Sequence, residues 1–242
     1  MPPPSPAALH CAAVIRLCCL IMRIALVAGA TGLVGSQCVE LLLARPDVER
    51  VHILVRRAPE RAPDPRLVVH VVDFDQLAVP DLRVDDAYLC LGTTMKLAGS
   101  REAFRRIDHD YTVAAGRLAK AAGATRAGLV SSVGASERSM TFYLRVKGET
   151  ERDVAALGFA QLCIAHPSFL DGERRERRPG EGAGIAISKA LAFTMIGGLR
   201  IYRPIHARQV AAGLIAAVAE DGAGMEILEY DSLMRLAAQT PS

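Results

Sequence analysis

The sequence predicts an α/β fold, a doubly wound parallel sheet with a small C-terminal region. Three observations lead to this prediction. A glycine-rich turn joins an apolar strand to an apolar helix, short apolar runs alternate with helical segments along most of the chain, and these runs are continuously apolar rather than alternating. Strands that are apolar on both faces are typical of parallel sheets covered by helices on both sides.

The segment from Arg23 to Arg57 shows this pattern most clearly. Arg23–Ala28 has the composition of a buried strand, an apolar periodic run continues to Ala44, and Val51–Val55 has the composition of a second strand. The whole segment has the length of one βαβ unit.

The turn inside this unit predicts a dinucleotide site. Gly29 allows a sharp turn off the strand, Gly32 lets backbone N–H groups approach a pyrophosphate, and Gly35 lets the helix pack close to the sheet. The phosphate would lie at the helix N-terminus, where free N–H groups and the helix dipole favour an anion. The expected cofactor contacts here are Gly29, Thr31, Gly32, Leu33, Val34 and Gly35.

The residues after the second strand favour NADP(H) over NAD(H). An NAD-binding chain usually has an acidic residue there, which binds the ribose 2′-hydroxyl. This chain has Arg56 and Arg57 instead, and a guanidinium group suits a 2′-phosphate. The alternative is a pair of solvated arginines on a loop.

The later segments continue the alternation of strands and helices. Further strands are expected at Leu67–Val72, Asp86–Leu91, Ala127–Val130, Phe159–Ala165 and Glu226–Leu228. Helices are expected at Ser100–Ala122 with Ser100 as N-cap, from Tyr143 to about Leu157, at 185–196, at Ala207–Ala219 and from Asp231 onward.

The first 21 residues differ from the rest of the chain. They begin with a proline-rich run that forms no regular element, and the apolar stretch that follows is too short to span a membrane. We therefore expect residues 1–21 to be a disordered or mis-called leader. Residues 22–242 would form one dinucleotide-binding domain, in which about 168–242 contribute a small substrate-binding portion.

Composition excludes several classes of function. The net charge is +3 and the basic residues are dispersed, so no nucleic-acid partner is expected. The six cysteines lack the spacing of a disulfide framework and the histidines form no metal-binding motif, so we expect reduced thiols, no bound metal and a cytoplasmic protein.

Tyr143 and Lys147 form the clearest candidate for chemistry. They are four residues apart and share one face of the predicted helix. A tyrosine titrates at about pH 10 in water, and a nearby cation favours its phenolate. Ser132, at the end of the fifth strand, could bind a carbonyl oxygen, so with a hydride donor the three residues suffice for carbonyl reduction.

These residues resemble the extended or atypical short-chain dehydrogenase/reductases, and more narrowly the Tat-interacting-protein oxidoreductase subgroup. The narrower similarity is carried by Cys90–Thr94, Asp108 with Asp110 and Tyr111, Val146–Glu149, and Glu176 with Arg178–Glu181. The resemblance implies a Rossmann fold that binds NADP(H). It also implies that Asp73 and Phe74 border the adenine and that Leu91 and Gly92 border the cofactor ribose.

Two features depart from the family's pattern. Many short-chain reductases use an Asn to complete a proton relay, and this chain contains no Asn. The subgroup also tends to carry Arg-Pro after the sixth strand, where this chain has His166 and Pro167.

The sequence leaves several functional alternatives open. We expect an NADP(H)-dependent reductase of a small carbonyl compound; a non-catalytic NADP(H)-sensing protein and, less favoured, a nucleotide-sugar epimerase or dehydratase are the alternatives. The Arg174–Arg178 cluster is a solvated loop, a clamp for an anion or a partner-binding patch. The apolar helix at 185–196 is core, a homodimer interface or the wall of a substrate pocket, and it is too short for a membrane span.

Overall fold

A computed structural model describes residues 22–60, 64–171 and 197–239. The predictions made for the leader, for the Arg174–Arg178 cluster and for the helix at 185–196 lie outside these residues. Within them, no helix is both long and apolar enough to cross a lipid bilayer.

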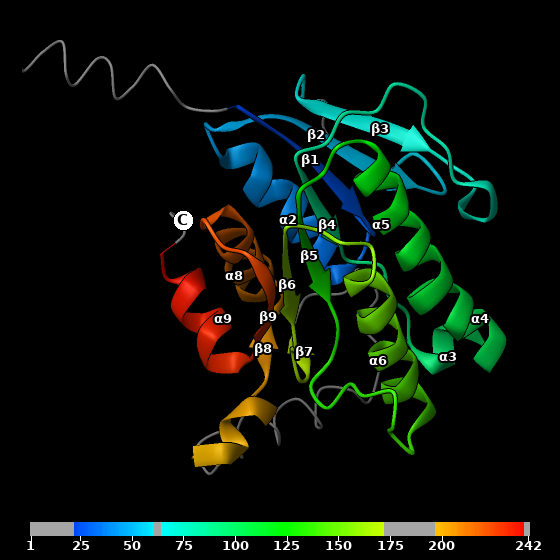
Figure 1. Ribbon diagram of the computed structural model, residues 1–242, viewed down its shortest axis with the longest axis vertical. Coiled ribbons are helices and arrows are strands. Elements are labelled where there is room, and N and C mark those ends of the chain that lie inside the picture. The colour runs from blue at the N-terminus through cyan, green and yellow to red at the C-terminus, as the bar shows by residue number, and fades with distance from the viewer. Residues whose placement is uncertain (1–21, 61–63, 172–196, 240–242) are drawn as a thin grey trace, which may run out of the picture.

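Seven parallel strands form the central sheet, in the order β3-β2-β1-β4-β5-β6-β9 (Figure 1). Their bounds are β1 Arg23–Ala28, β2 Val48–Val55, β3 Leu67–Val71, β4 Asp86–Leu89, β5 Arg126–Val130, β6 Gln161–Ala165 and β9 Gly224–Leu228. The strand order reverses direction next to β1, so the loops after β1 and β4 leave the sheet side by side. Ligands bind at this kind of position in open α/β sheets. The predicted doubly wound fold is confirmed.

Helices cover both faces of the sheet (Figure 1). One face packs against α2 (Leu33–Ala44), α8 (Ala207–Ala219) and α9 (Tyr230–Ala237), and the other packs against α5 (Tyr111–Ala121) and α6 (Phe142–Ala155). Successive strand residues point to opposite faces, and in β1 Val27 enters the first core while Leu26 and Ala28 enter the second. This explains why the strands are continuously apolar.

The segment after β4 differs from the single helix expected at Ser100–Ala122. It contains α3 (Met95–Ala98), α4 (Arg101–Arg105), a π-helical turn η2 (Arg106–Asp110) and then α5. Ser100 caps α4 as predicted, because its side chain accepts a hydrogen bond from the Ala103 N–H at 3.1 Å. The π turn shifts the helix register by one residue, which is common at functional sites.

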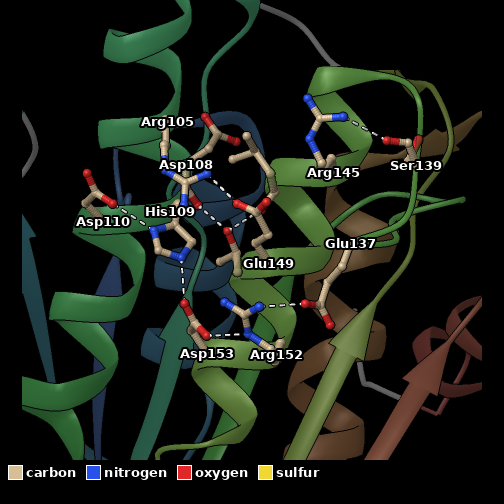
Figure 2. Close-up of polar contacts among 12 residues, drawn as sticks. Arg105, Asp108, His109, Asp110, Glu137, Ser139, Arg145, Glu149, Arg152 and Asp153 are labelled. Atoms are coloured by element: carbon tan, nitrogen blue, oxygen red, sulfur yellow. Dashed lines mark hydrogen bonds and ion pairs between the residues drawn. The ribbon is translucent and has the colours of Figure 1, made fainter.

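Ion pairs fasten α4 and the π turn to α6 (Figure 2). Arg105 pairs with Glu149, and His109 Nε2 lies 2.9 Å from Asp153 Oδ2. Asp153 also pairs with Arg152 of the same helix, which reaches Glu137 at 2.6 Å. The two helical segments are therefore held in a fixed register along their length.

The C-terminal region adds one strand, β9, to the main sheet and two helices, α8 and α9, to one of its faces. A small parallel sheet consists of β7 (Leu170–Asp171) and β8 (Ile205–His206), and a 3-10 segment, η4 (Gly197–Tyr202), precedes β8. A second 3-10 turn, η1 (Phe74–Gln76), follows β3. The predicted bounds of α8 are confirmed, and the predicted strand at 226–228 begins two residues earlier, as β9.

Candidate functional site

The glycine turn after β1 has the geometry that its sequence predicts. Gly29 has a φ of +87°, and a Cβ on it would lie 2.5 Å from the carbonyl oxygen of Cys90. A Cβ on Gly35 would overlap the Gly29 carbonyl oxygen, because α2 begins directly against the turn. Both positions therefore exclude any larger residue.

Gly32 lies at the N-terminus of α2 and has no side chain to cap the helix. Gly32 is the N-cap, it offers no side-chain cap, and the first turn of α2 contains no acidic residue. Thr31 and Gly32 are exposed, Leu33 is half-buried, and Val34 points into the core. The free N–H groups thus face outward with no competing anion from their own helix, which is the donor set that a pyrophosphate requires.

The ends of β2 and β3 lie at the same edge of the sheet. Arg56 and Arg57 follow β2 and are both exposed. Asp73, also exposed, follows β3 and caps the 3-10 turn by accepting the Asp75 N–H at 2.9 Å. Phe74 is buried, with its ring centroid 5.3 Å from that of Tyr111. Its ring therefore belongs to the core, and any contact with an adenine would come from its backbone or its ring edge.

The loop after β4 lies beside Lys147. Leu91 is half-buried and Gly92 is exposed. A Cβ on Gly92 would lie 3.7 Å from Lys147 Nζ and 3.6 Å from Asp108 Oδ1. The absence of a side chain at Gly92 thus leaves space beside the ammonium group.

Asp108 holds this lysine. Lys147 Nζ lies 2.7 Å from Asp108 Oδ1, and the two side chains are 7% and 0% exposed. The Thr93 N–H donates to Asp108 Oδ2 at 2.8 Å. The Thr150 hydroxyl donates to the Val146 carbonyl at 2.8 Å and also lies 3.2 Å from the Asp108 carbonyl oxygen. Asp108 lies in the π turn, and Figure 2 shows it between the two helical segments.

The charge of Lys147 is preserved by its neighbours. Burial lowers the pKa of Lys147, but the charge of Asp108 raises it, followed by smaller contributions from Tyr143 and Glu151. The net effect is a pKa above the usual 10.5. Lys147 is therefore a permanent cation at neutral pH.

Tyr143 lies near Lys147 on α6, and Ser132 follows β5. Tyr143 is half-buried on the first turn of α6, with its ring tilted against Phe104 at 5.4 Å between centroids. Ser132 is buried just after β5, and its hydroxyl donates weakly to the Val133 carbonyl at 3.5 Å. Helical spacing puts Tyr143 and Lys147 on one face, as the sequence predicts.

Sequence reasoning did not assign roles to Asp108, Thr150 or Glu151. Asp108 follows β4 by nearly twenty residues and lies in a π turn that helical periodicity did not predict. Glu151 is one helical turn beyond Lys147, so an extension of the Tyr143–Lys147 spacing by four residues was the available signal.

A family model described as NAD(P)H-binding matches residues 29–191. The chain belongs to this NAD(P)H-binding family. The match begins at the first glycine of the turn and continues through the α6 residues described above. It supports a nicotinamide dinucleotide as the ligand of the site.

Curated relatives extend the similarity over most of the chain. "Protein fmp52, mitochondrial" of Emericella nidulans is 34% identical over 219 residues, which cover 84% of this chain and 92% of that protein. Protein HTATIP2 of Rattus norvegicus is 32% identical over 214 residues, 86% of each chain. The predicted resemblance to the Tat-interacting-protein subgroup is thus confirmed.

The names of the relatives contradict the expected cytoplasmic location. Several are named as mitochondrial proteins. The prediction was wrong because it rested on the cysteines, and reduced thiols exclude only an oxidising compartment. They do not distinguish one reducing compartment from another.

Solved structures share the fold at low sequence identity. The human epimerase family protein SDR39U1 in complex with NADPH superposes with a TM-score of 0.57 at 18% identity, covering 85% of this chain and 72% of that one. Other structures with this fold are complexes with NAD. These matches agree with an NAD(P)-binding fold.

Proposed function

We propose that this protein is an NADP(H)-dependent reductase of small carbonyl compounds. The observation that carries the proposal is the position of Tyr143 and Lys147 on one face of α6, with Lys147 Nζ beside Gly92. A proton donor and a cation would thus lie next to a dinucleotide bound at this edge of the sheet.

The residues fit this cofactor. The uncapped N-terminus of α2 would bind the pyrophosphate, and Arg56 and Arg57 would bind a 2′-phosphate at the end of β2. Lys147 would bind the ribose next to the nicotinamide in the space that Gly92 leaves open. When bound, NADPH supplies the hydride.

The chain's own groups supply the proton and the orientation. The Ser132 hydroxyl would bind the substrate oxygen, and the Tyr143 hydroxyl would give that oxygen a proton. The Lys147 cation favours the phenolate that remains on Tyr143. Asp108 keeps Lys147 in place, because its fully buried carboxylate lies 2.7 Å from Lys147 Nζ.

The test is a screen of aldehydes, ketones and quinones, in which turnover is measured as the loss of NADPH absorbance. Tyr143→Phe removes one hydroxyl and keeps the ring, so turnover should disappear while NADPH affinity stays nearly unchanged. Lys147→Ala should reduce both, because Lys147 serves the phenol and the ribose. If the unmodified protein binds NADPH and reduces no member of the panel, the reductase proposal fails and a binding function replaces it.

A further inference from the structure

Arg203 is the exception among the half-buried arginines of the described residues. The others each donate from the guanidinium to a carboxylate or a backbone carbonyl: Arg23 and Arg126 to Asp86, Arg45 to Asp47, Arg105 to Glu149, Arg66 to Leu43 and Arg145 to Ser139. Arg203 Nε is fully buried, and within the described residues it has no hydrogen-bond partner. Nor does any carboxylate in that part of the chain pair with the Arg203 side chain.

The unpaired edge of this guanidinium indicates a ligand. A buried N–H costs free energy when it has lost water and gained no acceptor. Buried polar groups are nearly always paired in folded proteins, so an exception calls for an explanation. Arg203 as a whole is half-buried, so part of the side chain stays accessible to a ligand. Because the group is a cation that carries only donors, the ligand that fits it is an anion.

Arg203 lies at the edge of the sheet that carries Ser132. Ser132 follows β5, and the next residue, Val133, donates its N–H to the Pro167 carbonyl at 3.1 Å. Ser168, which follows Pro167, donates from its hydroxyl to the Arg203 carbonyl. The loops after β5 and β6 and the segment before β8 are therefore joined to one another at the carboxyl edge of the sheet.

The backbone of Arg203 is held on both sides. The Arg203 N–H donates to the Arg200 carbonyl at 3.0 Å, which closes a turn at the end of η4. After Arg203 the chain enters β8, which pairs with β7 in parallel. Figure 1 shows η4 at the same end of the molecule as the first turn of α6, where Tyr143 lies. The cation is thus fixed on the substrate side of the proposed proton donor.

The surroundings favour an organic anion with a single charge. The nearby cation of Arg200 is already paired with Asp231 at 2.7 Å, so Arg203 contributes one uncompensated positive charge among the described residues of this segment. One guanidinium balances one carboxylate and matches its two oxygens with a planar fork. Phe169 and Tyr202, on the two segments that meet here, are 71% and 45% exposed and offer apolar surface to a carbon chain.

We propose that Arg203 binds a carboxylate of the substrate, and that the protein therefore acts on oxo acids, which are small carbonyl compounds that also carry a carboxylate. The proposal rests on the reductase function proposed above and names its substrate class. Arg203 anchors the carboxylate, and the carbonyl group reaches the Ser132 and Tyr143 hydroxyls. The anchor contacts bound substrate and transition state alike, so its loss raises KM and leaves kcat nearly unchanged.

The first arm of the test compares oxo acids with their methyl esters at saturating NADPH. Levulinate and its longer homologues are the acids, and each ester has the same carbonyl group without the charge. For at least one acid, kcat/KM of the unmodified protein should exceed that of the ester by about tenfold or more, the scale of a charge-assisted hydrogen bond. Arg203→Gln should bring the ratio to about one through KM, with the ester within about twofold of its original value. Arg203→Lys keeps the charge without the fork and should retain part of the ratio.

Arg200→Gln is the matched control. It removes a cation of the same segment that is exposed and already paired with Asp231, so the ratio of acid to ester should not change. Thermal unfolding separates binding from folding. Arg203→Gln breaks no side-chain hydrogen bond or ion pair within the described residues, so its melting temperature should match that of the unmodified protein. A lower melting temperature with an unchanged ratio overturns the proposal, because Arg203 would then serve the fold alone.

The second arm does not depend on catalysis. Each acid and its ester are titrated into the NADP⁺ complex and followed by calorimetry. An acid should bind more tightly than its ester to the unmodified protein and to Arg200→Gln, and the two should bind equally to Arg203→Gln. Equal binding of every acid and its ester by the unmodified protein, or binding of neither, overturns the proposal. Acid binding that depends on Arg203 in a protein that reduces no carbonyl compound supports the carboxylate site and overturns the reductase function instead.

Discussion

Lys147 Nζ lies 2.7 Å from Asp108 Oδ1, so the cation proposed to bind the cofactor ribose is already paired with a fully buried carboxylate. Asp108 in turn accepts the Thr93 N–H from the loop after β4. One ion pair thus connects the loop after β4, the π turn and the face of α6 that carries Tyr143. Its energetic role can be measured directly.

Asp108→Asn should destabilise the protein by about 3–5 kcal/mol, because it leaves a buried cation without its counter-charge. Urea unfolding measures the change. Asp110→Asn is the control: Asp110 is exposed and pairs with His109 at 2.7 Å, and loss of such a pair costs up to about 1 kcal/mol. Equal losses in the two variants would contradict the central role of the Lys147–Asp108 pair.

The same pair predicts a pH dependence of stability. The folded-state pKa of Lys147 is raised above the ordinary 10.5. Its contribution is therefore fully present below pH 10.5 and is lost as pH rises through the folded-state value. Unfolding free energies measured from pH 9 upward should fall more steeply in the unmodified protein than in Asp108→Asn. Parallel curves would show that the lysine gains nothing from its partner.

Replacing Arg56 and Arg57 together by Ala should reduce the preference for NADPH over NADH. A charge-assisted hydrogen bond contributes about 1.5–3 kcal/mol, so the ratio of the two Kd values should shrink on the order of tenfold or more. Arg50→Ala provides the comparison, because Arg50 is exposed near the opposite end of the same strand and should leave the ratio unchanged. Equal affinity of the unmodified protein for the two cofactors would rule out a role for these arginines.

Gly32→Ala and Gly35→Ala should separate cofactor binding from folding. A Cβ at Gly32 meets only the Gly29 carbonyl at 3.2 Å within close range, so the variant should fold and bind NADPH more weakly at the crowded helix N-terminus. A Cβ at Gly35 overlaps the backbone of Gly29, so that variant should lose stability. Thermal unfolding and NADPH titration distinguish the two effects. A Gly35→Ala protein with normal melting temperature would disprove the close packing of α2 on the turn.

Ser132→Ala should lower kcat by about 10²–10⁴-fold, the usual range for loss of one acid–base or oxyanion partner. NADPH affinity should not change, because Ser132 is assigned to the substrate oxygen. Ser136→Ala, at an exposed serine of the same loop, should retain full turnover. Comparable rates in the two variants would remove Ser132 from the mechanism.

The interruption of the expected helix at Ser100–Ala122 shows where local sequence information ends. Helical periodicity and the Ser100 cap predicted a continuous helix. Ser100 does cap the first helix, α4, and the last helix, α5, ends within one residue of the expected end. The π turn between them is accompanied by contacts from another element, including the Thr150 hydroxyl on the Asp108 carbonyl. Thr150 is 42 residues from Asp108 in the sequence, so this contact cannot be predicted from the periodicity of the helix.

The sequence by itself determined the fold class, the glycine turn and the Tyr143–Lys147 face, because each depends on the periodicity or steric demands of a few neighbouring residues. The tertiary structure alone decided that Asp108 pairs with Lys147 and that Ser131, Glu151 and His166 meet. The physical reason is that those contacts depend on strand order and on the register between α6 and the strand ends. The strand order and this register both depend on segments that are distant in the chain. The contacts are stabilised because a buried polar group costs less free energy when it is paired.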